Sequence, residues 1–396
     1  MKNLLLGTTA LVGLGALAAT AQASDGIKLD VGGFFNTAYQ VNIDKHKEGD
    51  LGNEHNTDGV FNDAEIHFDG DVTLDNGLTA GAHIELEGET AADQISKSYM
   101  YFSGGFGEFR AGSDDQALET MCVTPPGGTT NFGAFSPNQI AANSGGLISA
   151  VTAGTISSNS ICTGVDAEGS SEKIVYYTPE FGGFQLGLSY TPNENAENQT
   201  NQGGPHIGMP TEDADTSQHN LAAYAVYNYE GDGWSLNWGG GGAWEGRVEG
   251  NGPGPNRPRQ DFYQTGVNVA FGDFTVGGAF EYYNDIGITD TGHTSDAWVA
   301  GAGVAYTVDA WTVGLQYSHG RYDAIDATSA DLGHVDQDRV ALTGNYDMGP
   351  GIALDAELAY TWTGGSVDSV ANSDGDTFDP NGYDAFEIGI GTAFTF

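Results

Sequence analysis

Basic residues are scarce in this chain of 396 residues, which carries 12 Lys and Arg against 54 Asp and Glu, a formal net charge of −42. Phosphate groups are bound by clustered Lys and Arg, so this composition argues against a nucleic-acid partner. So large an excess of one sign repels itself unless the acids are spread over solvated loops or a water-filled interior.

Long apolar runs are also nearly absent. The one near the start combines Lys2, an apolar and small-residue stretch over 4–19, and Ala21-Gln22-Ala23, which fits a signal-peptidase site. We expect residues 1–23 to be a removed signal peptide and 24–396 the mature protein; the alternative is a retained N-terminal membrane helix. No later segment approaches the ~20 consecutive apolar residues of a helical span, which excludes helical membrane crossings there.

Cysteine occurs twice, at Cys122 and Cys162. In an exported chain an even pair favours one disulfide. Closing that loop would stabilise the fold by roughly 4 kcal/mol on the chain-entropy account. Two buried free thiols are the alternative, and a single pair is too few for a Cys-rich metal site.

Helical periodicity is almost missing, and strict alternation takes its place. The run from Ile352 to Trp362 alternates apolar residues with Ala, Asp, Glu and Thr, and its rings lie toward one end. A period of two residues is typical of a strand with two different faces. About sixteen such runs are found: 28–41, 60–74, 78–88, 96–103, 108–114, 172–178, 184–191, 218–230, 234–248, 259–271, 274–284, 295–308, 311–323, 336–347, 352–365 and 382–396.

The connections between these runs alternate between short turns, such as 231–233 and 309–310, and long polar loops, such as 192–217 and 366–381. Short turns at one end and long loops at the other are typical of an outer-membrane barrel, whose strands need ~9–11 residues to cross. We therefore predict an all-β fold, a transmembrane antiparallel β-barrel of about sixteen strands. Such a barrel must close, so the last strand, ending at Phe396, should pair with the first. A soluble secreted β-rich adhesin is the alternative.

Three stretches resemble the trimeric general porins of Gram-negative bacteria, of the alphaproteobacterial type. They are KSYMYFSGGFGEFRAGSDDQA (97–117), KIVYYTPEFGGFQLGLSYTP (173–192) and the terminal Phe396. The resemblance implies a 16-stranded barrel, three barrels per assembly, and a third outer loop that folds inward to narrow the pore. The matching loop is 115–171, which departs from the family pattern in being rich in Ser, Thr and Gly.

Strand phase predicts which charges face the lumen, since a charge on the lipid face costs ~2–4 kcal/mol near the midplane. A lumen charge with no special role is the alternative at each position. The candidate residues fall into acids of the constriction loop, bases of the pore wall, and acids of the lumen wall with His67 and His83 between them. The predicted acids of the constriction loop are Asp114, Asp115, Glu119, Asp166 and Glu168. The predicted bases of the pore wall are Arg110, Lys173, Arg247 and Arg339. The predicted acids of the lumen wall are Glu65, Asp69, Glu85 and Glu87.

Acids outnumber bases, and rings of carboxylates select cations. We predict an outer-membrane porin for passive diffusion of ions and small hydrophilic solutes, with cation preference. A solute-specific outer-membrane channel is the alternative. The expected partners are outer-membrane lipid, a homotrimer and small solutes. No nucleophile motif accompanies the histidines, so we expect no enzyme; we also expect no cofactor and no metal site, although loop acids could bind Ca²⁺ weakly.

Overall fold

The computed structural model of the protein describes twelve parts of the chain. These are residues 26–44, 56–89, 95–135, 162, 171–193, 218–246, 260–288, 294–324, 332–367, 370–371, 377–378 and 382–396. The expected signal peptide lies outside them.

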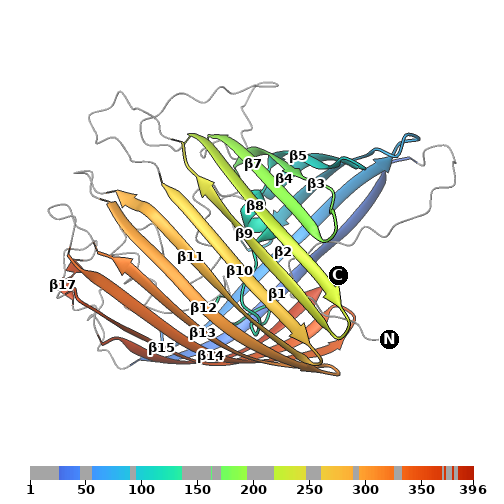
Figure 1. Ribbon diagram of the computed structural model, residues 1–396. Coiled ribbons are helices and arrows are strands. Elements are labelled where there is room, and N and C mark those ends of the chain that lie inside the picture. The colour runs from blue at the N-terminus through green and yellow to red at the C-terminus, as the bar shows by residue number, and fades with distance from the viewer. Residues whose placement is uncertain are drawn as a thin grey trace.

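Sixteen strands form one closed antiparallel barrel (Figure 1). Each barrel strand pairs with the barrel strand that follows it in the chain, and the last pairs with the first. This confirms the predicted fold. The barrel strands are β1 (Lys28–Asp44), β2 (Asp58–Thr73), β3 (Thr79–Glu87), β4 (Ile95–Gly104), β5 (Gly107–Ser113), β6 (Glu172–Tyr177), β7 (Phe184–Asn193), β8 (Gln218–Gly231), β9 (Trp234–Trp244), β10 (Asp261–Phe271), β11 (Phe274–Ile288), β12 (Thr294–Val308), β13 (Trp311–Asp323), β14 (His334–Gly349), β15 (Ile352–Gly365) and β18 (Asp384–Thr395).

Three short elements complete the described structure. Helix α1 spans Ala117–Met121, and β16 (Val370–Ala371) pairs with β17 (Thr377–Phe378) as a separate small ribbon. No helix in the described ranges is long and apolar enough to cross a membrane.

The barrel closes where β1 meets β18. Their register runs from Phe34 opposite Thr395 to Asp44 opposite Ala385. The backbone of Gly33 exchanges two hydrogen bonds with that of Phe396, at 3.0 and 3.1 Å. Closure satisfies the backbone groups that an open sheet edge would leave unpaired in hydrocarbon. The predicted pairing of the last strand with the first is thus confirmed.

The two faces of each strand differ as the alternation predicts. In β13, Leu315 and Tyr317 are exposed on the outside, whereas Gln316 and Ser318 between them are buried. The outer face of the barrel is therefore apolar and rich in rings, and the inner face is polar or small. The short turns that join β8 to β9 and β10 to β11 use Gly233 and Gly272 at positive φ, 85° and 59°, where an L-residue with a side chain is disfavoured.

Candidate functional site

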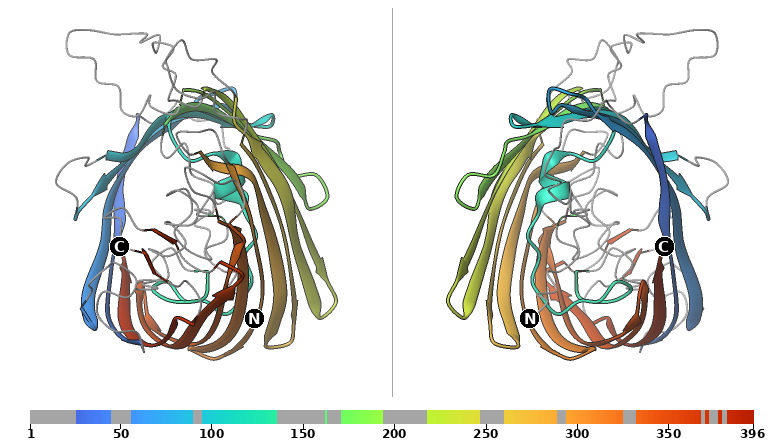
Figure 2. Two further views of the ribbon diagram at one scale, coloured as in Figure 1. Left: turned by 90° about the vertical axis from the view of Figure 1, so that its left-hand side faces the viewer. Right: turned by 90° about the vertical axis from the view of Figure 1, so that its right-hand side faces the viewer.

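The chain leaving β5 turns into the barrel instead of away from it. Residues 114–135, including α1, lie along the inner wall (Figure 2). Five consecutive backbone carbonyls of this segment accept hydrogen bonds from side chains of the wall. They are those of Val123 from Gln264, Thr124 from Asn268, Pro125 and Pro126 from Gln316, and Gly127 from Thr343.

The donors of those bonds come from β10, β13 and β14, so the loop crosses several strands of one side of the barrel. Farther along, Asn131 Nδ2 donates to Asp355 of β15 at 2.8 Å, and Ala134 N donates to Gln316 Oε1 at 2.8 Å. The described loop backbone is therefore hydrogen-bonded to the wall at several points, although residues 114–135 form no strand. The described part of the predicted inward loop, 115–135, lies inside the barrel.

Two wall glycines make room for this backbone. A Cβ added at Gly303 would lie 1.9 Å from the carbonyl oxygen of Pro126, and one at Gly314 would lie 2.0 Å from that of Gly127. Both distances are far inside van der Waals contact, so no larger residue fits without moving the loop. The small-residue face seen in the sequence is thus, at these positions, the surface that receives the loop.

A disulfide and a buried acid hold a second part of the loop. Cys122 is bonded to Cys162, with Cα atoms 6.0 Å apart and 40 residues of separation. The backbone N–H of Cys162 donates to Glu281 of β11 at 3.0 Å, and the Tyr283 hydroxyl donates to the same carboxylate. Glu281 is fully buried, so the disulfide-linked part of the loop is held to the wall by a carboxylate that water does not contact.

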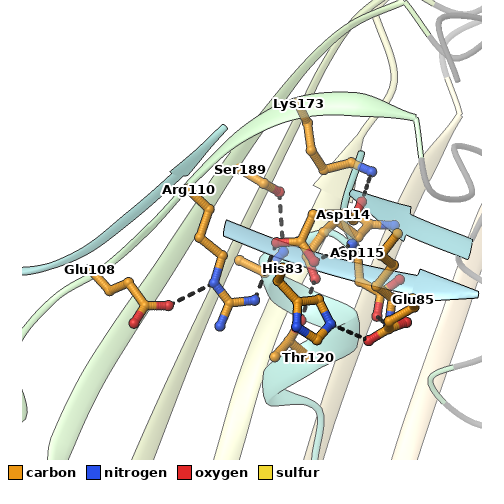
Figure 3. Close-up of polar contacts among 12 residues, drawn as sticks. His83, Glu85, Glu108, Arg110, Asp114, Asp115, Thr120, Lys173 and Ser189 are labelled. Carbon is orange, nitrogen blue, oxygen red and sulfur yellow. Dashed lines mark hydrogen bonds and ion pairs between the residues drawn. The ribbon is translucent and has the colours of Figure 1, made fainter. Parts of the chain in front are cut away.

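The start of the loop carries a group of paired charges (Figure 3). Arg110 of β5 pairs with Glu108 at 2.7 Å and with Asp114 at 3.2 Å. The ammonium of Lys173 donates to the backbone oxygen of Asp114. Burial raises the pKa of the Asp114 carboxyl above its usual range, and the Arg110 charge opposes that shift. The sequence predicted Arg110, Asp114 and Lys173, and the structure brings them together.

Lys97 of β4 is a base that the sequence reasoning missed. Its ammonium lies 2.8 Å from Asp115 and 3.3 Å from Glu85, so it joins the loop to the wall. The alternation along β4 could have identified it, because Lys97 lies on the same inward face as Tyr99 and Tyr101.

Next to this charge group, a row of rings crosses the lumen wall from β1 to β6. Phe34 and His67 are 5.9 Å apart at their centroids, His67 and His83 5.6 Å, and His83 and Tyr99 5.1 Å. The Arg110 guanidinium continues the row, 4.9 Å from the Tyr99 ring and 5.1 Å from that of Tyr177. The wall therefore offers apolar ring surface beside its charges.

The acids of this wall bind its histidines. Glu65 lies 2.8 Å from His67, and His83 lies between Asp69 at 2.6 Å and Glu85 at 2.8 Å. Glu87 follows on β3, with the inward parity of Glu85. Glu119 is half-buried on α1.

Arg339 stands apart from the charges at the start of the loop. It is 1% exposed and pairs with Glu357 at 2.6 Å and Glu387 at 2.7 Å. The backbone of Gly133 also hydrogen-bonds Glu357, which places this triad beneath the loop. The structure therefore puts Arg339 on the inner side of its strand but covered, where the sequence suggested a pore-wall base. Arg247, Asp166 and Glu168 lie outside the described residues.

A closed barrel with an apolar outer face, a polar interior and a loop folded into that interior defines a transmembrane barrel channel. The Gram-negative porin family matches residues 7–366 of this chain. The chain therefore belongs to the Gram-negative porin family, and it is an outer-membrane barrel, as predicted.

Two curated relatives are similar over about half of their own length. A monosaccharide porin of a Halomonas species and the major outer membrane protein of Halomonas elongata are each 28% identical over 221 residues, 52% of this chain and 54% of theirs.

Solved structures agree in fold. A loop-deleted OmpT of Vibrio cholerae has a TM-score of 0.59 at 13% identity, covering 94% of this chain and 100% of its own. An anion-selective porin of Comamonas acidovorans has a TM-score of 0.55 at 18% identity, covering 93% and 100%. At these identities the likeness concerns the barrel alone.

Proposed function

We propose that this porin is a cation-preferring channel for passive diffusion of ions and small hydrophilic solutes, narrowed by the loop that begins at Asp114. One observation supports the preference above the others: two of the three bases beside the start of the loop, Lys97 and Arg110, are each bracketed by two carboxylates. Lys97 lies between Glu85 and Asp115, and Arg110 between Glu108 and Asp114. The remaining wall acids are then an excess of negative charge.

That excess is placed where it can act on ions in the pore. Asp69 is 43% exposed at its side chain, and Glu65 and Glu87 lie opposite each other on the same inner face. Fixed carboxylates along a water-filled path lower the free energy of a passing cation and raise that of an anion. Screening over ~8 Å at physiological salt limits this effect to the narrow part of the pore.

The experiment is a reversal-potential measurement in planar bilayers under a KCl gradient. The protein should show a potential of the sign that K⁺ preference gives, and Asp115→Asn with Glu119→Gln should reduce it. Asp232→Asn with Asp273→Asn, in the exposed turns between β8 and β9 and between β10 and β11, is the control of equal charge change and should leave the potential as it is. A reversal potential of anion-selective sign would overturn the proposal.

A solute-specific channel is the second candidate, and the row of rings beside carboxylates favours it. Rings present apolar faces on which a sugar ring can stack, while carboxylates accept hydrogen bonds from its hydroxyls. The name of the Halomonas relative, a monosaccharide porin, suggests which class of solute to try. Saturable block of single-channel current by a monosaccharide, weakened in Tyr99→Ala, would support this candidate; conductance unaffected by any monosaccharide would exclude it.

We also propose that three chains assemble, as the family resemblance implies. A trimer form of Vibrio cholerae OmpT is among the similar folds, with a TM-score of 0.56. Sedimentation of the detergent-solubilised protein would test this, and a monomer at every protein concentration would contradict it.

A further inference from the structure

Two histidines and a glutamate converge on the lumen wall between β2 and β3. One ligand atom from each of His67, His83 and Glu85 can be chosen so that all three lie within 4.8 Å of one another. His67 lies on β2, whereas His83 and Glu85 lie two residues apart on β3, a spacing that matches no metal-binding motif. The antiparallel register brings them together.

The register explains the arrangement. His67 lies directly opposite Glu85, and Asp69 lies directly opposite His83. The two histidines are therefore diagonal neighbours on one face of an antiparallel pair, a relation that brings long side chains within reach. The face is the inner one, and the side chains of His67 and His83 are 26% and 12% exposed. An ion dissolved in the pore can reach them.

The surrounding carboxylates orient the imidazoles. Asp69 lies 2.6 Å from Nδ1 of His83, which directs the other ring nitrogen, Nε2, toward Glu85 at 2.8 Å. A carboxylate on the remaining nitrogen of a histidine is the usual second partner of a metal-binding imidazole, because it fixes the tautomer and the ring direction. Glu65 lies 2.8 Å from Nε2 of His67 and can supply a further carboxylate oxygen as a ligand.

We propose that His67, His83 and Glu85 form a binding site for a divalent transition-metal ion of the zinc class. Two imidazoles and one carboxylate are a common ligand set of Zn²⁺, with the fourth position left to water or to a further carboxylate. Bonds of about 2.0–2.2 Å require ligand atoms no more than about 4.2 Å apart. The three ligand atoms already lie within 4.8 Å of one another, so only small side-chain rotations are needed.

Lys97 is the charge that opposes the ion. Its ammonium lies 3.3 Å from Glu85 Oε2, whereas the other oxygen of that carboxylate, Oε1, faces His83. Asp115, at 2.8 Å, compensates Lys97 from the loop side. The site therefore binds a cation against one partly neutralised base, and removal of that base should tighten binding.

A bound ion would change permeation. It adds two positive charges beside the narrow part of the pore, where the proposed preference depends on an excess of carboxylates. Zinc should therefore reduce current and cation preference together. Binding itself does not depend on the proposed selectivity, so the two proposals can fail separately.

The test is calorimetric titration of the purified, chelator-treated protein in detergent with ZnCl₂. We expect one tight site per chain that is weakened by about 10-fold or more in His67→Ala and in His83→Ala, and lost in the double variant. His319→Ala and His219→Ala, which alter histidines on the outer face, are the matched controls and should bind as the parent does. Lys97→Met should bind more tightly.

Heat-modifiable migration in gels establishes that each variant forms the barrel. X-ray absorption at the zinc edge should show two imidazoles in the bound parent and none in the double variant. Absence of zinc uptake up to millimolar concentration would overturn the proposal. So would unchanged affinity and stoichiometry in the folded double variant, because the ion would then sit elsewhere.

Discussion

Asn131 of the inward loop donates a hydrogen bond to Asp355 of β15 at 2.8 Å, across 224 residues of sequence. The backbone N–H of Asn131 donates to the same carboxylate oxygen at 3.2 Å, and Asn345 donates to the other oxygen at 2.7 Å. One buried aspartate thus accepts three hydrogen bonds, two of them from the loop near its described end, and is one of the contacts that position the loop.

Asp355→Ala should release that end of the loop. Loss of a buried, charged acceptor leaves the two donors of Asn131 unpaired, at about 1–3 kcal/mol each. We expect noisier single-channel current and a lower temperature of barrel unfolding. Asp347→Ala, in the same sheet near an exposed turn, is the control; equal current noise in both variants would show that Asp355 does not hold the loop.

Gly314→Val should displace the loop from the wall, because the new side chain would occupy the space of the Gly127 carbonyl. Overpacking of this kind costs about 1–3 kcal/mol. The expected result is an altered single-channel conductance in a barrel that still forms. Gly344→Val is the control, since a Cβ at Gly344 meets nothing within 4 Å. Conductance changed equally in both would contradict the fit described here.

Reduction of the Cys122–Cys162 disulfide should loosen the loop without opening the barrel. The bond closes a 40-residue separation, for which the chain-entropy account gives roughly 4 kcal/mol. Current noise should therefore rise when a reductant is added to the parent. A variant with both cysteines changed to Ala should be noisy from the start and should not respond. A parent indifferent to reductant would remove the disulfide from the control of the pore.

Arg339→Met should lower the free energy of unfolding strongly and change the ion selectivity of the channel little. It would leave Glu357 and Glu387 buried without their cation, which costs about 3–5 kcal/mol. Arg321→Met is the control: Arg321 is 41% exposed and pairs with Asp336 on the outside, so its loss should cost about 0–1 kcal/mol. Thermal unfolding measures the first effect and reversal potential the second. A large selectivity change with unchanged stability would place Arg339 on the open pore wall after all.

Much of this architecture could be predicted because a strand with lipid outside and water inside must alternate. That alternation is complete in the run ending at Trp362 and in the terminal strand ending at Phe396. The same alternation correctly assigned Arg110 and Lys173 to the inner face. Lys97 could have been assigned by the same rule.

The rest depends on neighbours that alternation does not specify. Whether Arg339 borders the pore depends on the path of the loop, and that path is set by side chains such as Gln316 and Asp355 far along the chain. The convergence of His67 with His83 depends on the register of β2 and β3, since a shift by one residue would send one of them to the other face.

The wall donates hydrogen bonds to five successive main-chain oxygens of the loop, from Val123 to Gly127. Hydrogen bonds to main-chain oxygens do not depend on which side chain a residue carries, provided that the backbone keeps its conformation. The side chains of the loop that line the pore can therefore be substituted while the attachment of the loop to the wall is kept. Channels of different selectivity can then be engineered, or can evolve, on one unchanged barrel.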